Sequence, residues 1–237
     1  MRSIKYSVFA AAMVVTSFST VKAQTADDIV QKHVTAIGGA DNWKKVKSVK
    51  MTGSMNAGGN EMPITITIVH NTGFRMDLSI AGMNNYQILT KEGGWSYFPV
   101  GGQVKAEAMP AEAVKESQDQ LDVMDALVDY KAKGRKVTLL GKDDVEGTEC
   151  FKLKLTHENG KEETMFIDAA TFHHIRSVEK MKANGKEVEA TSNYGNYQKL
   201  PEGIMYPMSI ETPEGPLVLK TVEINKPVDN SIFKPAN

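Results

Sequence analysis

The chain has 237 residues, of which 41% are hydrophobic and 24% are charged. These values are typical of a soluble globular protein and exclude a disordered or collagen-like chain. The formal net charge is -1 and there is no basic block. We therefore expect no nucleic-acid partner, because phosphate contacts need clustered Lys and Arg. A single cysteine, Cys150, excludes an internal disulfide framework and a metal site with several Cys ligands.

The first 23 residues have the pattern of a secretory signal peptide. Arg2 and Lys5 make the start positive, and residues 6–18 are apolar. Small residues around Ala23 predict cleavage before Gln24. The alternative is a buried N-terminal helix, whereas a transmembrane span would need about 20 apolar residues. No second apolar stretch follows, so we expect residues 24–237 to form a single soluble domain without an integral membrane segment.

A helix is predicted to begin at Thr25, a favourable N-cap, with acidic residues in its first turn. Its apolar positions recur at helical spacing, and they are Ile29, Val30, His33, Val34 and Ile37. Gly38-Gly39 supplies the C-terminal stop. A short second turn over residues 40–46 carries Trp43.

Strand patterns with a period of two fill most of the remaining chain. Residues 64–68 and 74–80 alternate apolar and polar side chains, and the dipeptides Asn159-Gly160 and Asn184-Gly185 predict hairpin turns. About eleven strands in meander order follow from these patterns. One long helix is expected between Pro110 and about Tyr130, because its apolar residues recur at helical spacing. The predicted fold is α+β: a strongly curved antiparallel sheet with helices covering one face.

No common catalytic motif occurs in the sequence, which has no Gly-x-Ser-x-Gly, His-Glu-x-x-His, phosphate loop or dinucleotide fingerprint. His173-His174, with His157 and Asp168 nearby, is the cluster that most suggests a metal. Adjacent strand residues point to opposite faces, so His173 and His174 are not expected to bind one ion together. His33 is interpreted as a core histidine. The sequence therefore predicts no enzyme activity, catalytic residue, metal or cofactor.

Methionine is abundant after the signal segment. Its flexible, polarizable side chain suits a surface that must accommodate variable apolar ligands, although ordinary core packing also explains each residue taken alone. The eleven are Met51, Met55, Met62, Met76, Met83, Met109, Met124, Met165, Met181, Met205 and Met208.

Several stretches resemble a known family. They are His70-Asn71-Thr72-Gly73-Phe74-Arg75-Met76, the run from Gln87 to Pro99 that contains Trp95-Ser96-Tyr97, Gly102-Gln103-Val104, Met165-Phe166-Ile167-Asp168 with Ile175, and the ending from Asp229 to Pro235. In these motifs, and in its helix before a long strand meander, the chain resembles the outer-membrane lipoprotein-sorting family, the Lol-type carriers.

The resemblance implies an incomplete β-barrel around an apolar cavity, with helices as a lid. It also implies a soluble periplasmic carrier that takes lipid or acylated lipoprotein toward the outer membrane, with sorting components of the inner and outer membranes as possible partners. On this basis we expect one set of residues to line the cavity: Ile64, Ile66, Ile68, Phe74, Met76, Leu78, Trp95 and Tyr97 from the sheet, and Leu121, Met124 and Leu127 from the covering helix. His70 stands where the family has an arginine thought to latch the lid.

Two other functions remain open. The same scaffold can serve as a periplasmic sensor that binds a protein at its exposed sheet surface. A hydrolase with an unrecognised site would require at least two of His157, Asp168, His173 and His174 to meet in one pocket.

Overall fold

The computed structural model describes residues 24–183 and 186–235. The predicted signal peptide, residues 1–23, and the Asn184-Gly185 turn lie outside the described residues. Among the described helices, none is long and apolar enough to cross a membrane.

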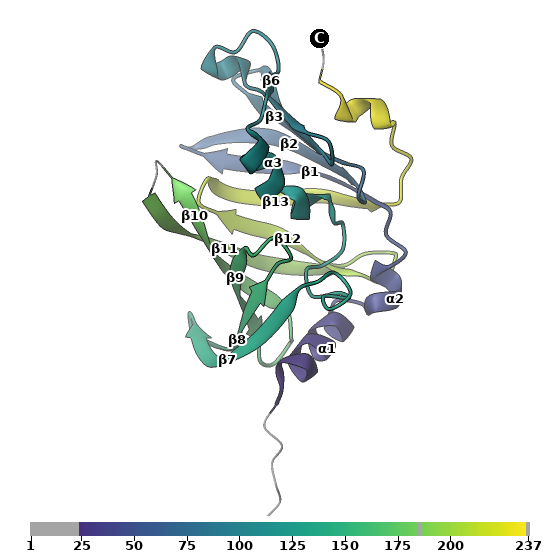
Figure 1. The fold of residues 1–237 in the computed structure, drawn as a ribbon, viewed down its shortest axis with the longest axis vertical. Coiled ribbons are helices and arrows are strands. Elements are labelled where there is room, and N and C mark those ends of the chain that lie inside the picture. Colours follow the sequence, from purple (N-terminus) through teal and green to yellow (C-terminus); the bar gives the residue numbers. More distant parts are fainter. Residues whose placement is uncertain (1–23, 184–185, 236–237) are drawn as a thin grey trace, which may run out of the picture.

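A single 13-stranded antiparallel sheet dominates the structure (Figure 1). The chain forms six strands that run outward to one edge of the sheet and seven that return from the other edge, so that the last strand pairs with the first. The strands are β1 (Ser48–Ala57), β2 (Asn60–Val69), β3 (Gly73–Ile80), β4 (Met83–Thr90), β5 (Gly94–Tyr97), β6 (Glu107–Ala108), β7 (Lys136–Val145), β8 (Thr148–Thr156), β9 (Glu162–Asp168), β10 (His174–Ala183), β11 (Lys186–Lys199), β12 (Met205–Thr212) and β13 (Gly215–Ile224). The order from edge to edge is β6-β5-β4-β3-β2-β1-β13-β12-β11-β10-β9-β8-β7.

The sheet curves without closing. Within the described residues β6 and β7 are its two edges, and no pairing joins them. The predicted class, a curved and incomplete antiparallel barrel, is confirmed, with thirteen strands in place of about eleven.

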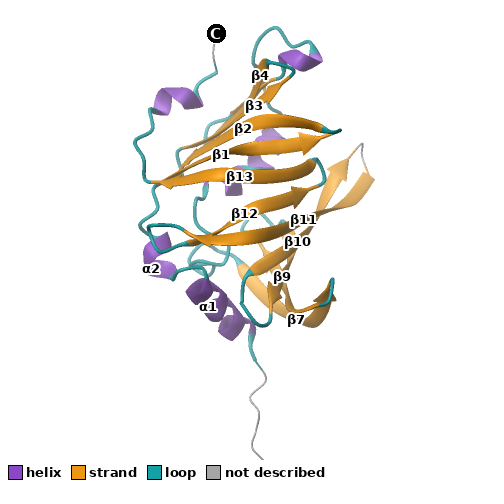
Figure 2. Ribbon diagram, turned by 180° about the vertical axis from the view of Figure 1, so that it is seen from behind, coloured by secondary structure: helices purple, strands orange, loops and turns teal. Residues whose placement is uncertain are grey.

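Two faces of the sheet follow from the strand register. Met51 lies opposite Ile66, which lies opposite Met76, so these side chains share one face. We call this the inner face. Figure 1 shows it crossed by the segment between β6 and β7, and Figure 2 shows the opposite, outer face.

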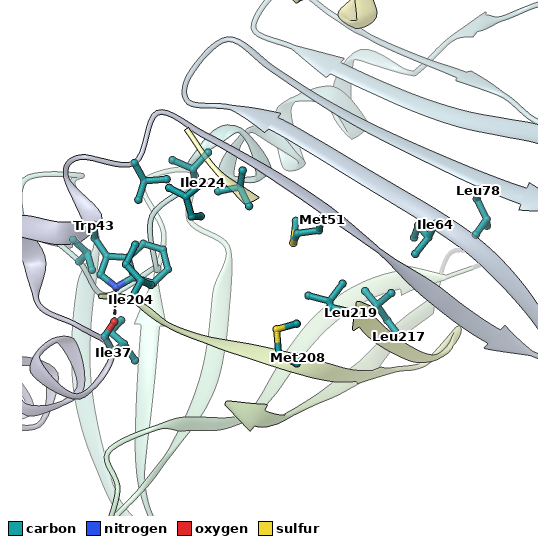
Figure 3. Packing of buried hydrophobic residues seen from close by; sticks show 14 of the residues in the cluster. Ile37, Trp43, Met51, Ile64, Leu78, Ile204, Met208, Leu217, Leu219 and Ile224 are labelled. Carbon is teal, nitrogen blue, oxygen red and sulfur yellow. Dashed lines mark hydrogen bonds between the residues drawn. The ribbon is translucent and has the colours of Figure 1, made fainter. Parts of the chain in front are cut away.

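The inner face carries the main hydrophobic core (Figure 3). Helix α1 (Ala26–Ala36) and helix α2 (Ala40–Trp43) lie at one end of it. The predicted N-cap is confirmed, because the Thr25 side chain and Asp28 form a reciprocal capping box. The indole of Trp43 donates a hydrogen bond of 3.1 Å to the Ile37 carbonyl, which joins the two helices beside the core. A second cluster packs α1 against β8 and β9 through Ile29, Val30, Leu153, Leu155, Met165 and Ile167.

The predicted long helix over residues 110–130 is wrong. The segment contains α3 (Ala111–Glu116) and a 3-10 turn η2 (Gln118–Leu121), and then continues without regular structure. Asp122 accepts a hydrogen bond from the Met124 amide at 3.1 Å, and Asp125 accepts one from the Leu127 amide at 2.8 Å. Aspartate side chains that bind nearby amides in this way compete with the helical backbone bonds, so the chain turns instead.

Candidate binding cavity under the strap

Residues 118–135 run across the inner face between α3 and β7, and we call this segment the strap. A cavity of about 300 Å³ lies between the strap and the sheet. Its apolar wall includes Ile37, Trp43, Val49, Ile68, Val123, Met124, Met165, Met205 and Ile210. A second space of about 580 Å³ lies beside it, and Asp119, Asp122, Met124, Arg135 and His157 line both. The two spaces are therefore separated by strap side chains.

The inner face is not fully covered by the strap. Several of its hydrophobic side chains are packed against the core but remain only half-buried: Met55, Ile66, Ile68, Met76, Ile80, Tyr206 and Ile210. Completed cores bury such residues fully, because exposed apolar area costs about 25 cal/mol per Å². The face thus keeps apolar surface available to a ligand.

Three aspartates at three-residue intervals face three histidines from other segments. Asp125 Oδ1 lies 3.3 Å from His33 Nε2, and Asp122 Oδ1 lies 3.5 Å from His70 Nδ1. Asp119 Oδ2 lies 4.0 Å from His157 Nδ1. The strap aspartates therefore contact histidines of α1, of the β2–β3 turn and of the β8–β9 turn.

Asp122 is the most heavily paired of the three. It lies 2.5 Å from Lys133 Nζ and 3.3 Å from Arg135 Nη2, in addition to His70. Burial lowers the pKa of His70, and Asp122 only partly offsets this because Lys133 and other lysines lie nearby. Within the strap, Asp122 thus forms ion pairs with both Lys133 and Arg135.

The His33–Asp125 pair is deeply buried. His33 Nδ1 lies 2.7 Å from the Phe172 carbonyl, which can only accept, so this nitrogen carries a proton. Burial by itself lowers the pKa of His33, but Asp125 and the carbonyl outweigh it and raise the pKa. Burial by itself raises the pKa of Asp125, but His33 and the Leu127 amide lower it to about 2. Both shifts favour the charged forms of the two residues.

A polar group closes the end of the cavity formed by β9 and β10. The Ser177 hydroxyl donates to Glu163, and His174 Nε2 lies 3.0 Å from the same hydroxyl. Glu163 Oε2 lies 3.5 Å from His157 Nε2. Burial raises the pKa of Glu163, but the nearby His157 and His174 and the hydrogen bond from Ser177 lower it overall. Glu163 therefore stays ionised although it is only 8% exposed.

The hydrolase interpretation required at least two of four residues in one pocket, and two of them do line the cavity. His157 and His174 line the cavity, and Asp168 and His173 lie outside its lining. His174 Nε2 also lies 2.9 Å from the Arg176 carbonyl, so this nitrogen carries the proton and is not free to accept one from Ser177. The group acts here as a buried hydrogen-bonded network. In the described part of the chain, no group of three or more His, Cys, Asp or Glu is arranged to hold a metal ion.

The predicted lining residues separate into several groups. Ile68 and Met124 line the 300 Å³ cavity. Ile66, Phe74 and Met76 are half-buried on the inner face, as placed by the register of β2, β3 and β4, and Ile64 and Leu78 lie deeper in its core. Leu121 and Leu127 are fully buried in the strap, at 2% and 1% exposure. Whether any of them binds a ligand stays a prediction.

Trp95 and Tyr97 need a correction, because they lie on the outer face. Trp95 pairs with Ile88 and Tyr97 with Tyr86, whereas the inner-face Phe74 pairs with Leu89, the neighbour of Ile88. Both aromatics belong to an outer cluster that also holds Phe233. They are therefore absent from the cavity wall.

His70 contacts Asp122 of the strap and is one of three histidines that contact strap aspartates; its role as a lid latch stays a prediction. The sequence analysis missed the polar end of the cavity, with Glu163, Tyr194 and Tyr197, and the three strap aspartates. The three-residue spacing of Asp119, Asp122 and Asp125 was the signal that could have revealed the strap contacts.

Comparison with models of protein families gives no match, and comparison with curated proteins gives none either. Solved structures do match. A LolA superfamily protein from Nitrosomonas europaea is 13% identical, with a TM-score of 0.54 over 90% of this chain and 98% of that one. A protein domain from Vibrio parahaemolyticus, described as an outer membrane lipoprotein-sorting domain, is 11% identical, with a TM-score of 0.53 over 87% and 94%. The chain therefore has the curved, unclosed sheet fold of the LolA superfamily.

Proposed function

We propose that this protein is a soluble periplasmic carrier that binds the acyl chain of a lipid or lipoprotein under the strap and delivers it toward the outer membrane. The observation that carries this proposal is the half-buried apolar inner face, which includes Ile66, Ile68 and Met76. The likeness to LolA superfamily structures supports it at the level of the fold. Residues 1–23, read as a signal peptide, would direct the chain to the periplasm, where sorting components of the two membranes would be its partners.

The energetics favour a ligand of this kind. Each buried methylene is worth about 0.8 kcal/mol, so a long acyl chain gains on the order of 10 kcal/mol at full burial. The cavity of about 300 Å³ is at the lower end of the range for small-molecule sites. A full acyl chain therefore requires the strap to move and to join this cavity to its neighbour.

The strap is built so that it can move. It lacks strand pairing with the sheet, and its contacts include those of Asp119, Asp122 and Asp125 with three histidines and the 2.9 Å hydrogen bond from the Asn71 amide to the Leu121 carbonyl. Side-chain contacts of this kind exchange with water more readily than a strand ladder, so strap opening costs less than opening the sheet. A ligand that binds the open form would shift the population toward it.

Native mass spectrometry with lipid extraction, on protein purified from the periplasm of an export host, tests the proposal. We expect stoichiometric lipid or acylated peptide. Ile66→Glu and Met76→Glu should each reduce uptake of a fluorescent fatty-acyl probe by more than the loss of folded protein explains. Ser54→Glu is the control, because Ser54 pairs with Pro63 on the outer face.

Other outcomes would lead elsewhere. A ligand-free mass, together with no uptake of the probe, would contradict the carrier and favour the protein-binding module on the same scaffold. Equal losses of binding and folded fraction in Ile66→Glu and Met76→Glu would remove these residues from the binding surface.

A further inference from the structure

Five carboxylates line the 300 Å³ cavity: Asp119, Asp122, Asp125, Glu163 and Glu179. Three of them pair with a lysine or an arginine. Asp122 binds Lys133 and Arg135, and Lys161 Nζ lies 2.8 Å from Glu179 and 3.8 Å from Asp119. Asp125 and Glu163 are the two without one among the described residues.

Histidines face these two remaining carboxylates. Asp125 has His33 at 3.3 Å, and Asp125 and the Phe172 carbonyl raise the pKa of that histidine despite its burial. Glu163 has the Ser177 hydroxyl and His157, whose Nε2 is 3.5 Å away. Lys161 also lies within electrostatic reach of Glu163, but its ammonium group is bound to Glu179. Glu163 is therefore a buried carboxylate at the cavity that faces histidines and a hydroxyl and pairs with no Lys or Arg of the described residues.

His157 is loosely held beside Glu163. Its side chain is 7% exposed, and both ring nitrogens are buried without a hydrogen-bond partner. They lie 3.5 Å and 4.0 Å from the carboxylates of Glu163 and Asp119, which is beyond the usual N–H···O range. The His157 imidazole thus lies between the carboxylates of Glu163 and Asp119 without a hydrogen bond to either.

Resting on the proposed carrier function, we propose that Glu163, at the polar end of the cavity beside His157, binds the ammonium group of an amphiphile whose apolar chain lies along the inner face. An ammonium group brings one positive charge and three donors, which matches an end rich in acceptors. A carboxylate or phosphate head would meet like charge there and would be disfavoured. The ammonium group can belong to a simple long-chain amine or to an ethanolamine phosphate head.

The test compares the affinities of ligands that have the same chain length and different head groups. Each ligand competes with a fluorescent apolar reporter for the protein. Decylamine, 1-decanol and decanoate are the probes, at one pH near neutrality. We expect decylamine to bind about tenfold more tightly than decanoate, which corresponds to one charge contact. Short-chain phosphatidylethanolamine and phosphatidylglycerol identify the source: a preference for the former indicates a zwitterionic head, and equal binding indicates a simple amine.

Two variants test whether Glu163 causes the preference for the ammonium head group. Glu163→Gln should abolish it while 1-decanol binds as before. Glu162→Gln is the matched control, because Glu162 is the neighbouring exposed residue and pairs with Lys154 outside the cavity. His157→Ala should strengthen the preference, because it removes the imidazole that lies 3.5 Å from Glu163 and leaves room there for the ammonium group, and it decides the assignment if Glu163→Gln does not fold.

The outcomes are distinguishable. Equal binding of all three decyl compounds, or tighter binding of decanoate, would overturn the ammonium site while leaving the carrier function in place. Binding of none of them would overturn both.

Discussion

His33 on α1 places Nε2 3.3 Å from Oδ1 of Asp125 in the strap, and the His33 side chain is only 1% exposed. This pair joins the first helix to the segment that covers the inner face. Removing one partner of a buried ion pair leaves the other charge unpaired, which typically costs about 3 kcal/mol or more.

The first prediction is a pH dependence of stability that this pair produces. The pKa of His33 is raised above 6.5 in the folded protein, so its contribution is fully present below pH 6.5 and is lost as pH rises through the folded pKa. The pKa of Asp125 is lowered from 3.8 to about 2, so its contribution is present above pH 3.8 and is lost as pH falls toward 2. The pair is therefore most stabilising between these two limits.

The difference in free energy of unfolding between wild type and His33→Gln, from urea titrations, measures this contribution. We expect about 3 kcal/mol near pH 5.5 and clearly less near pH 9. The difference is needed because the lowered pKa values of His70 and His174 change stability in the opposite direction. A difference that does not change with pH would show that His33 is not charged in the fold.

The second prediction concerns the strap. Asp122→Asn leaves the largely buried Lys133 and Arg135 without their carboxylate, so we expect residues 118–128 to exchange amide hydrogens at least about tenfold faster while the sheet stays protected. Asp129→Asn is the control, because Asp129 pairs with the exposed Lys44. Exchange that rises equally in strap and sheet would indicate global destabilisation instead of strap release.

The strands of the sheet were predictable because apolar and polar residues alternate along each strand, which assigns them to its two faces. Ile64, Ile66 and Ile68 alternate with polar residues, and the register places all three on the inner face. Alternation shows which residues share a face but not which face it is. Trp95 and Tyr97 do share a face, but the tight turn into β5 places it outside.

The strap and the polar end were not predictable in the same way. Leu121, Met124 and Leu127 have the spacing of a helix, but Asp122 and Asp125 accept hydrogen bonds from nearby amides that compete with helical bonds. Glu163 and Ser177 meet because β9 and β10 pair, a long-range relationship that local patterns do not contain.

The third prediction is that Cys150 is unreactive in the folded protein. Its side chain is fully buried, and burial is the main cause that raises its pKa to about 11. Because the thiolate is the reactive form, we expect almost no labelling by a disulfide reagent near pH 8 until denaturant is added. Rapid labelling of the native protein would contradict the burial of β8 at this residue.

The fourth prediction concerns the outer cluster. An added Cβ on Gly73 would lie 2.4 Å from Cγ of Phe233, a residue that is 4% exposed and belongs to the 3-10 turn η3 (Asn230–Phe233). Gly73→Ala should therefore displace the ring and lower the free energy of unfolding by about 1–3 kcal/mol. Gly101→Ala is the control, because nothing lies within 4 Å of the corresponding Cβ.

A double-mutant cycle identifies the contact responsible. In a Phe233→Ala background the ring is absent, so Gly73→Ala should cost much less than in wild type. An unchanged cost would mean that strain within β3, and not the clash with Phe233, sets the effect. The predicted coupling would establish that Phe233 packs closely on Gly73 of β3. This packing would then hold residues 230–233 on the outer face.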